Sequence, residues 1–143
     1  MILIVCVDDR MGMAFNHRRQ SKDRILRERL LQNAAGTPLW MNSYSAGQFE
    51  ENEIHTDTAD SLIYADDSFM EKAGTGEYCF AETTDILPFE KRVEKLILYR
   101  WNRRYPADLY FTIPLEDHGW RLIHTEDFSG HSHEKITEEI YMP

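Results

Sequence analysis

The unbroken apolar run over residues 1–7 restricts the possible folds more than any other part of this sequence. A strand with one face in water alternates apolar and polar side chains, whereas a strand covered on both faces does not. Strands covered on both faces are typical of mainly parallel sheets that carry helices on both sides. The sequence therefore predicts an α/β fold with this run as an inner strand.

The length and composition indicate a single folded domain. The chain has 143 residues, of which 42% are hydrophobic and 12% aromatic, so we expect one domain over residues 1–143. No window holds the ~18 apolar residues that a membrane helix needs. The N-terminus lacks the positive flank of a signal peptide. Cys6 and Cys79 lie in apolar runs, which favours buried thiols. We expect a cytoplasmic protein without membrane contact.

Charge is distributed unevenly along the chain, whose formal net charge is −9. Residues 17–31 contain six basic and two acidic side chains, a local charge of +4. Residues 49–90 contain twelve acids and one lysine, a local charge of −11. Such a negative field repels phosphate polyanions, so nucleic acid is not an expected partner.

The remaining pattern predicts alternating strands and helices. Ser21 can cap a helix that ends near Gly36, and residues 83–85 read as a helix start with Pro88 in the first turn. Asp66 or Asp67 can cap a short helix. Strands are expected at 39–41, 62–64, 77–81, 95–101, 120–128 and 136–142, the short helix at 68–73, and mainly loop at 47–60. We therefore expect an α/β fold with a mixed, mainly parallel sheet of about seven or eight strands, flanked by helices and closed by an antiparallel hairpin.

Several short strings support a family resemblance. Gly12-Met13 follows the first strand, Phe15-Asn16 comes next, and Glu-Lys-Leu-Ile-Leu at 94–98 lies in a later strand. Together with the order of elements, these strings resemble dihydrofolate reductase over most of the chain except residues 47–61. The resemblance implies that family's fold, an NADPH cofactor and a pterin-like substrate.

The cofactor motifs of that family are altered here. Where the family has a Gly-Gly pair beside the NADPH diphosphate, this chain has Glu82, and one like-charge contact of this kind costs about 4 kcal/mol at ~4 Å. The phosphate-pairing arginine of the family is replaced around Ser43. The loop after Gly12 is also shorter. The implied cofactor positions are Ser43, Ser45, Glu82, Thr83 and Thr84. We therefore expect no NADPH binding with the usual affinity.

Asp23 is the sharpest candidate for chemistry. The resemblance places it at the family's catalytic carboxylate and implies a substrate site at Val5, Asp23 and Arg27. A carboxylate at a helix start could accept two hydrogen bonds from a pterin-like ring edge. The alternative is a first-turn acid that pairs with Arg19 or Arg27 and stabilises the helix.

Other motifs carry less information. His131 and His133 could bind a metal as alternate residues of one strand. They lie beside Gly130 in an expected hairpin turn, however, so we expect exposed loop histidines and no metal site. No serine lies in a nucleophile-elbow string, and no glycine-rich loop could hold phosphate.

Three functional hypotheses follow. The first is a divergent dihydrofolate reductase-like protein that has lost the standard NADPH site and binds a small molecule or a protein partner. The second is an active, divergent NAD(P)H-dependent reductase of a pterin-like or other small heterocyclic substrate, with Asp23 holding the ring. The third is an acidic interaction or decoy protein of a mobile element, which uses the charge of residues 49–90.

Overall fold

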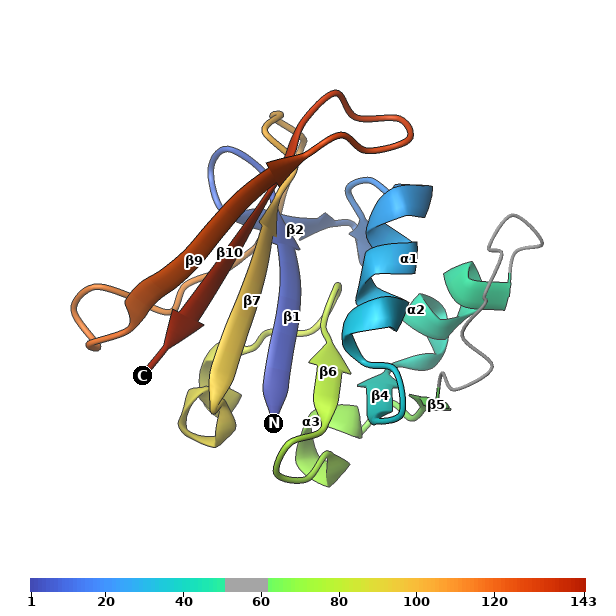
Figure 1. Ribbon diagram of the computed structural model, residues 1–143, viewed down its shortest axis with the longest axis vertical. Coiled ribbons are helices and arrows are strands. Elements are labelled where there is room, and N and C mark those ends of the chain that lie inside the picture. The colour runs from blue at the N-terminus through green and yellow to red at the C-terminus, as the bar shows by residue number, and fades with distance from the viewer. Residues whose placement is uncertain (51–61) are drawn as a thin grey trace.

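The structure is a computed structural model and describes residues 1–50 and 62–143. A seven-stranded sheet forms its centre, with five parallel strands and an antiparallel pair at one edge (Figure 1). In spatial order the strands are β5 (Leu62–Ala65), β4 (Pro38–Met41), β6 (Tyr78–Phe80), β1 (Ile2–Val7), β7 (Lys95–Arg100), β10 (Ile136–Met142) and β9 (Arg121–Phe128). The mixed α/β sheet predicted from the sequence is thereby confirmed.

A second, smaller antiparallel sheet lies against one end of the first. It contains β3 (Arg18–Arg19), β2 (Gly12–Phe15) and β8 (Leu109–Tyr110). Asn16 and His17, between β2 and β3, both have positive φ, as a two-residue hairpin turn requires. The short segment after Gly12 is therefore a tight hairpin.

The first strand occupies the central position that its apolar run predicts. Leu3, Val5 and Val7 are buried in the core on one face of the sheet, and Ile4 is buried in the core on the other face. β1 pairs in parallel with both β6 and β7. Burial on both faces explains why this strand has no polar alternation.

Short helices connect the strands. The helical elements are α1 (Arg24–Asn33), α2 (Ser43–Gly47), α3 (Phe69–Lys72) and the 3-10 helices η1 (Gln48–Glu50) and η2 (Leu87–Arg92). α1 covers one face of the sheet, and its buried leucines Leu26, Leu30 and Leu31 belong to that core (Figure 1). The core of the opposite face includes residues from α3 and from the segment 111–120.

The start of α1 differs from the sequence prediction. Asp23, rather than Ser21, is the N-cap, and its carboxylate accepts hydrogen bonds from the amides of Ile25 and Leu26. The helix ends at Asn33, before Gly36, as predicted. Ser21 and Asp23 are both good N-caps by residue type, so the sequence pattern alone could not show which of them caps the helix.

The helix start expected at residues 83–85 is wrong. These residues form bends and a coil, and the 3-10 helix η2 begins only at Leu87. Pro88 lacks an amide hydrogen and disfavours helical geometry in the residue before it, so a regular helix cannot run through this position. The Asp85 carboxylate instead accepts a hydrogen bond from the Leu87 amide.

Two smaller differences concern the other helices. The loop expected at residues 47–60 begins inside α2 and η1, and residues 51–60 lie outside the described part. The short helix expected at 68–73 is confirmed as α3, but Ser68 holds its N-cap position, and neither Asp66 nor Asp67 does.

Two further expectations can be compared with the structure. Cys6 and Cys79 are free thiols, Cys79 buried and Cys6 partly buried. Across residues 1–50 and 62–143, none of the helices combines the length and the apolar character required to cross a membrane.

The packing of α1 gives a test of this core. Leu30 is 0% exposed, so Leu30→Ala should leave a cavity and lower the free energy of unfolding by about 2–5 kcal/mol in urea titrations. Leu122 is 49% exposed on β9, and Leu122→Ala should change stability by at most about 0.5 kcal/mol. Equal losses in the two variants would contradict the assigned core.

Candidate functional site

The carboxyl ends of the parallel strands form the natural site of this sheet. The chain runs from β1 outward to β4 and later returns to β6 and β7 on either side of β1. In open α/β sheets, ligands bind at the carboxyl edge where the strand order reverses in this way. Asp8, Asn42 and Glu82 follow the strands at this edge.

Asp8 holds the turn that leaves β1. Its carboxylate accepts hydrogen bonds from the amides of Arg10 and Gly12 at 2.8 Å and from the Gln20 side chain at 2.8 Å. Burial raises the pKa of the Asp8 carboxyl, but the hydrogen bonds donated by the Gly12 and Arg10 amides outweigh burial, and the pKa lies below its ordinary value. A side chain at Gly12 would meet Asp8 Oδ2 at 2.7 Å, so the turn requires glycine.

Glu82 is buried and has partners from two other elements. Arg19 Nε donates to its carboxylate at 3.0 and 3.3 Å, and Gln48 Nε2 donates at 3.0 Å. The Arg19 guanidinium also stacks over the Tyr44 ring at 4.3 Å. Glu82 therefore ties β3 and the α2–η1 segment to the end of β6.

The residues at the start of α2 form a second group of contacts. Asn42 Oδ1 accepts from the Ser45 amide at 2.8 Å, and Asn42 Nδ2 donates to Thr83 Oγ1 at 3.1 Å. The Ser43 amide donates to Asp67 Oδ1 at 3.2 Å. The structure thus brings the predicted positions Ser43, Ser45, Glu82 and Thr83 together, with half-buried Thr84 next in the chain.

Asp23 is also enclosed at this edge, with a side chain that is 0% exposed. Besides the two α1 amides, it accepts from the amides of His131 at 3.0 Å and Ser132 at 2.9 Å. Arg19, one of the two partners expected for it, pairs with Glu82 instead. Asp23 therefore joins the start of α1 to the loop between β9 and β10.

The ionised form of Asp23 is strongly favoured. Burial raises the pKa of its carboxyl, but hydrogen bonds from the His131 amide, the His133 ring and the Ser132 amide outweigh that effect. The pKa lies well below its ordinary value. Gly130 is part of the same arrangement, because a Cβ there would lie 2.6 Å from Asp23 Oδ2.

His133 is the functional candidate that the sequence interpretation missed. Its ring is buried, its Nδ1 lies 2.9 Å from Asp23 Oδ2, and it stacks on Trp101 at 4.5 Å between centroids. Ser21 Oγ at 3.0 Å and Tyr105 Oη at 3.2 Å both contact its Nε2. The expectation of an exposed histidine is wrong for His133 and correct for His131.

The substrate residues implied by the resemblance do not share one open cleft. Val5 is buried in the core on the opposite face of the sheet from α1. Asp23 and Arg27 line a cavity with Cys6, Glu82 and Trp101. The volume of this cavity is about 10 Å³, room for a single water and not for a heterocyclic ring.

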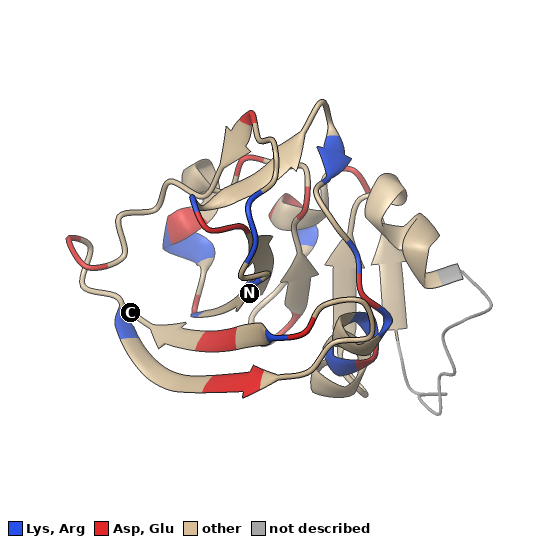
Figure 2. Cartoon of the chain, turned by 90° about the horizontal axis from the view of Figure 1, so that it is seen from above, with Lys and Arg blue, Asp and Glu red and all other residues tan. Residues whose placement is uncertain are grey.

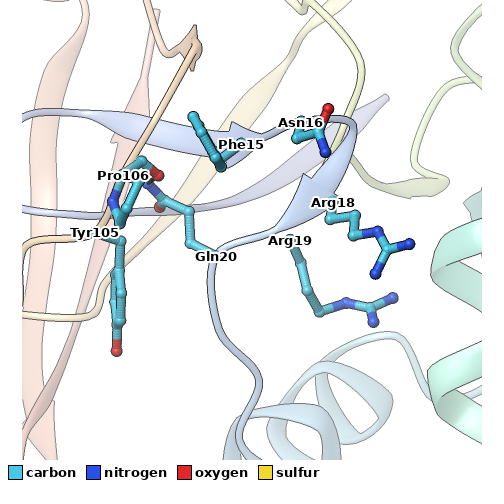
Figure 3. Close-up of a pocket in the computed structure, with 7 residues that line it drawn as sticks. All are labelled: Phe15, Asn16, Arg18, Arg19, Gln20, Tyr105 and Pro106. Carbon is cyan, nitrogen blue, oxygen red and sulfur yellow. Dashed lines mark hydrogen bonds between the residues drawn. The ribbon is translucent and has the colours of Figure 1, made fainter.

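Two open pockets lie beside the small sheet. One, of about 300 Å³, is lined by Phe15, Asn16, Arg18, Arg19, Gln20, Tyr105 and Pro106 (Figure 3). In Figure 3 the Tyr105 ring lies on one side of Gln20, and the two arginine side chains lie on the other side and extend away from it. The other pocket, of about 420 Å³, is lined by Ala14, His17, Thr83, Asp85, Asp108 and Leu109. The first is basic and aromatic, and the second is acidic.

A cluster with metal-ligating side chains lies on the β9–β10 hairpin. Among the described residues, His124, Glu126 and Glu138 place ligand atoms within 4.8 Å of one another. Arg29 already pairs with Glu126 at 2.7 Å and with Glu138 at 3.3 Å. The positive charge of Arg29 already neutralises these carboxylates, as a metal cation would. We therefore interpret the cluster as an ion-pair network.

The Asp23 contacts predict a defined response to pH. An acid with a depressed folded-state pKa stabilises the fold above its unfolded value of ~3.9, and this contribution is lost as pH falls through the folded-state pKa. Asp23→Asn should lower the free energy of unfolding at pH 7 by about 1–3 kcal/mol, because an amide nitrogen cannot accept these hydrogen bonds. Between pH 5 and pH 2 the difference from wild type should shrink, measured by urea unfolding. Exposed Asp117→Asn is the control, and a difference that does not change with pH would contradict the assignment.

Comparison with known proteins identifies the fold. No protein-family model matches the chain, and no curated protein matches it. Among solved structures it is similar to a dihydrofolate reductase from Enterococcus faecalis, determined in complex with NADP(H) and RAB-propyl. The TM-score is 0.66 at 9% sequence identity, over 99% of this chain and 94% of that one. The chain therefore has the dihydrofolate reductase fold.

Proposed function

We propose that this dihydrofolate reductase-fold protein binds a small anionic molecule with a planar group, and that it does so without NADPH in the usual position. The observation that carries the proposal is the buried Glu82–Arg19 pair at the end of β6. It fills the carboxyl edge with the chain's own charges, and the 300 Å³ pocket opens on the β2–β3 side of this edge.

The residues at this edge do not fit a dinucleotide diphosphate. A diphosphate needs free amides at a helix start or nearby cations. Here the Ser43 amide donates to Asp67 and the Ser45 amide donates to Asn42. Arg19 is neutralised by Glu82, and the neighbouring 420 Å³ pocket contains Asp85 and Asp108. The negative charges of these two carboxylates repel a dianionic diphosphate.

The 300 Å³ pocket has the chemistry of a small-anion site. Arg18 has no ion-pair or hydrogen-bond partner for its side chain among the described residues, and its planar guanidinium suits a carboxylate or phosphate group. Phe15, which is 49% exposed, and Tyr105 both line this pocket (Figure 3). Aromatic walls favour a planar ligand group. Figure 2 draws β3, which consists of two arginines, as a blue arrow at this end of the molecule.

Reductase activity, the second hypothesis, has support from the fold and none from the side chains of the edge. Asp23 would have to release the 129–133 loop before it could hold a substrate ring, because its oxygens already accept from that loop. The cofactor would have to displace the contacts of Glu82. This hypothesis therefore needs two rearrangements, and the binding hypothesis needs none.

The decoy hypothesis depends on one continuous acidic surface. Four acids of the 49–90 segment lie in residues 51–61, outside the described part. Among the others, Asp66 pairs with Lys72, Glu77 accepts from Trp40, and Glu90 accepts from Trp120. Figure 2 accordingly shows acids spread over several elements. The described acids serve mostly as local hydrogen-bond acceptors.

A ligand titration tests the proposal. Phenyl phosphate should raise the melting temperature by several degrees at about 100 times its dissociation constant, a stabilisation of about 2.7 kcal/mol. Inorganic phosphate and phenol should each bind more weakly, because each offers one half of the interaction. NADPH at millimolar concentration should give no shift.

Matched variants locate the binding. Arg18→Ala should abolish the phenyl phosphate shift, whereas Arg121→Ala removes the same charge from exposed β9 and should retain it. If both variants lose the phenyl phosphate shift equally, the shift depends on the net charge of the protein and not on a site at Arg18. A clear NADPH shift would instead favour the reductase hypothesis.

A further inference from the structure

The side chains of Ser21, His133 and Asp23 form a continuous hydrogen-bonded line beside the 300 Å³ pocket. Ser21 Oγ lies 3.0 Å from His133 Nε2, and His133 Nδ1 lies 2.9 Å from Asp23 Oδ2. Hydroxyl, imidazole and carboxylate in this order activate serine nucleophiles on several unrelated folds. The arrangement is defined by geometry and not by sequence order, so the lack of a nucleophile-elbow string does not exclude it.

The line fixes the proton positions on the imidazole. Asp23 is ionised, because its hydrogen bonds hold the pKa of its carboxyl well below the ordinary value. An ionised carboxylate can only accept, so Nδ1 of His133 carries the hydrogen and the lone pair of a neutral ring lies on Nε2. Stacking on Trp101, with 27° between the ring planes, holds the imidazole in place. Nε2 is therefore oriented to take the Ser21 proton.

Exposure increases along the line toward the nucleophile. Asp23 and His133 are buried, whereas Ser21 is only half-buried. Gln20 precedes Ser21 and lines the 300 Å³ pocket, as does Tyr105, whose hydroxyl contacts the same Nε2 at 3.2 Å (Figure 3). Ser21 itself lines the 10 Å³ cavity, and the 300 Å³ pocket adjoins the serine end of the line through Gln20 and Tyr105.

We propose that Ser21 is the nucleophile of an acyl-transfer site for small carboxylic esters, with His133 as general base and Asp23 as a positioning residue. Ser21 Oγ bonds to the ester carbonyl carbon and its proton passes to Nε2. The ester C–O bond breaks, and the leaving alcohol takes that proton. Water then attacks the acyl-serine, gives a proton to Nε2, and the acid leaves as Ser21 recovers its hydrogen.

The two proposals can fail separately. The acyl-transfer site rests on the Ser21–His133–Asp23 geometry alone. The choice of esters with a planar, anionic half rests on the proposed function, because Arg18 and the aromatic walls would hold that half. If the probe labels Ser21 but phenyl phosphate does not bind, the acyl-transfer site is retained and the preference for planar, anionic esters is rejected.

A fluorophosphonate probe tests the nucleophile in the intact protein. Ser21 Oγ should displace fluoride from phosphorus, its proton should pass to His133, and the intact mass should increase by one phosphonyl group. Peptide mapping of the wild-type protein should place the adduct on Ser21. No adduct at millimolar probe, or an adduct on Tyr105, would overturn the assignment.

Variants separate chemistry from folding. Ser21→Ala should abolish labelling, whereas Ser129→Ala, in the exposed part of the 129–133 loop, should label at the wild-type rate. Asp23→Asn, tested at a pH where circular dichroism shows a folded protein, should slow labelling by about 10³–10⁴-fold without moving the adduct, because the ring loses its required tautomer. An unchanged rate in folded Asp23→Asn would remove Asp23 from the mechanism, a result that a purely structural role predicts.

Discussion

The Asp23 carboxylate is the interaction on which this end of the molecule depends. It caps α1 and accepts hydrogen bonds from three consecutive residues of the loop between β9 and β10, 108 to 110 positions away in the chain. An isolated buried carboxylate is very costly, and it persists only when its oxygens are fully hydrogen-bonded. One acid thereby joins the main helix to the C-terminal hairpin and fixes His133 against Trp101.

The same physical rule applies on the other side of the cavity. Glu82 is buried with Arg19 and Gln48, so the two acids that line the 10 Å³ cavity are both engaged within the chain. An edge that could hold a ligand through its polar groups instead uses them to hold its own elements together. The fold remains that of dihydrofolate reductase, while the chemistry of the edge follows from these side chains.

Local patterns predicted the sheet well and the site poorly. A buried strand shows its burial in its own sequence, as a run of apolar residues. Such runs predicted strands at β1, β4, β7 and β10, and the structure has strands there. The expected helix at 83–85 is absent because Pro88 decides where a helix can start. The sequence pattern singled out Asp23, but its partner His133 lies 110 positions away. The periodicity of apolar residues within one helix or strand cannot predict a contact between residues so far apart. A histidine near Gly130 is also typical of an exposed turn.

The hydrogen-bond count around His133 argues for more than a structural role. Once Nδ1 donates to Asp23, the ring needs one donor for the lone pair on Nε2. Two hydroxyls, from Ser21 and Tyr105, compete for that single lone pair. Folding alone requires only one of them, and a fully paired buried network is normally the more stable solution. The surplus hydroxyl lies at the half-buried end of the line, beside the open pocket, where a bound carbonyl could take up the interaction that the imidazole cannot satisfy.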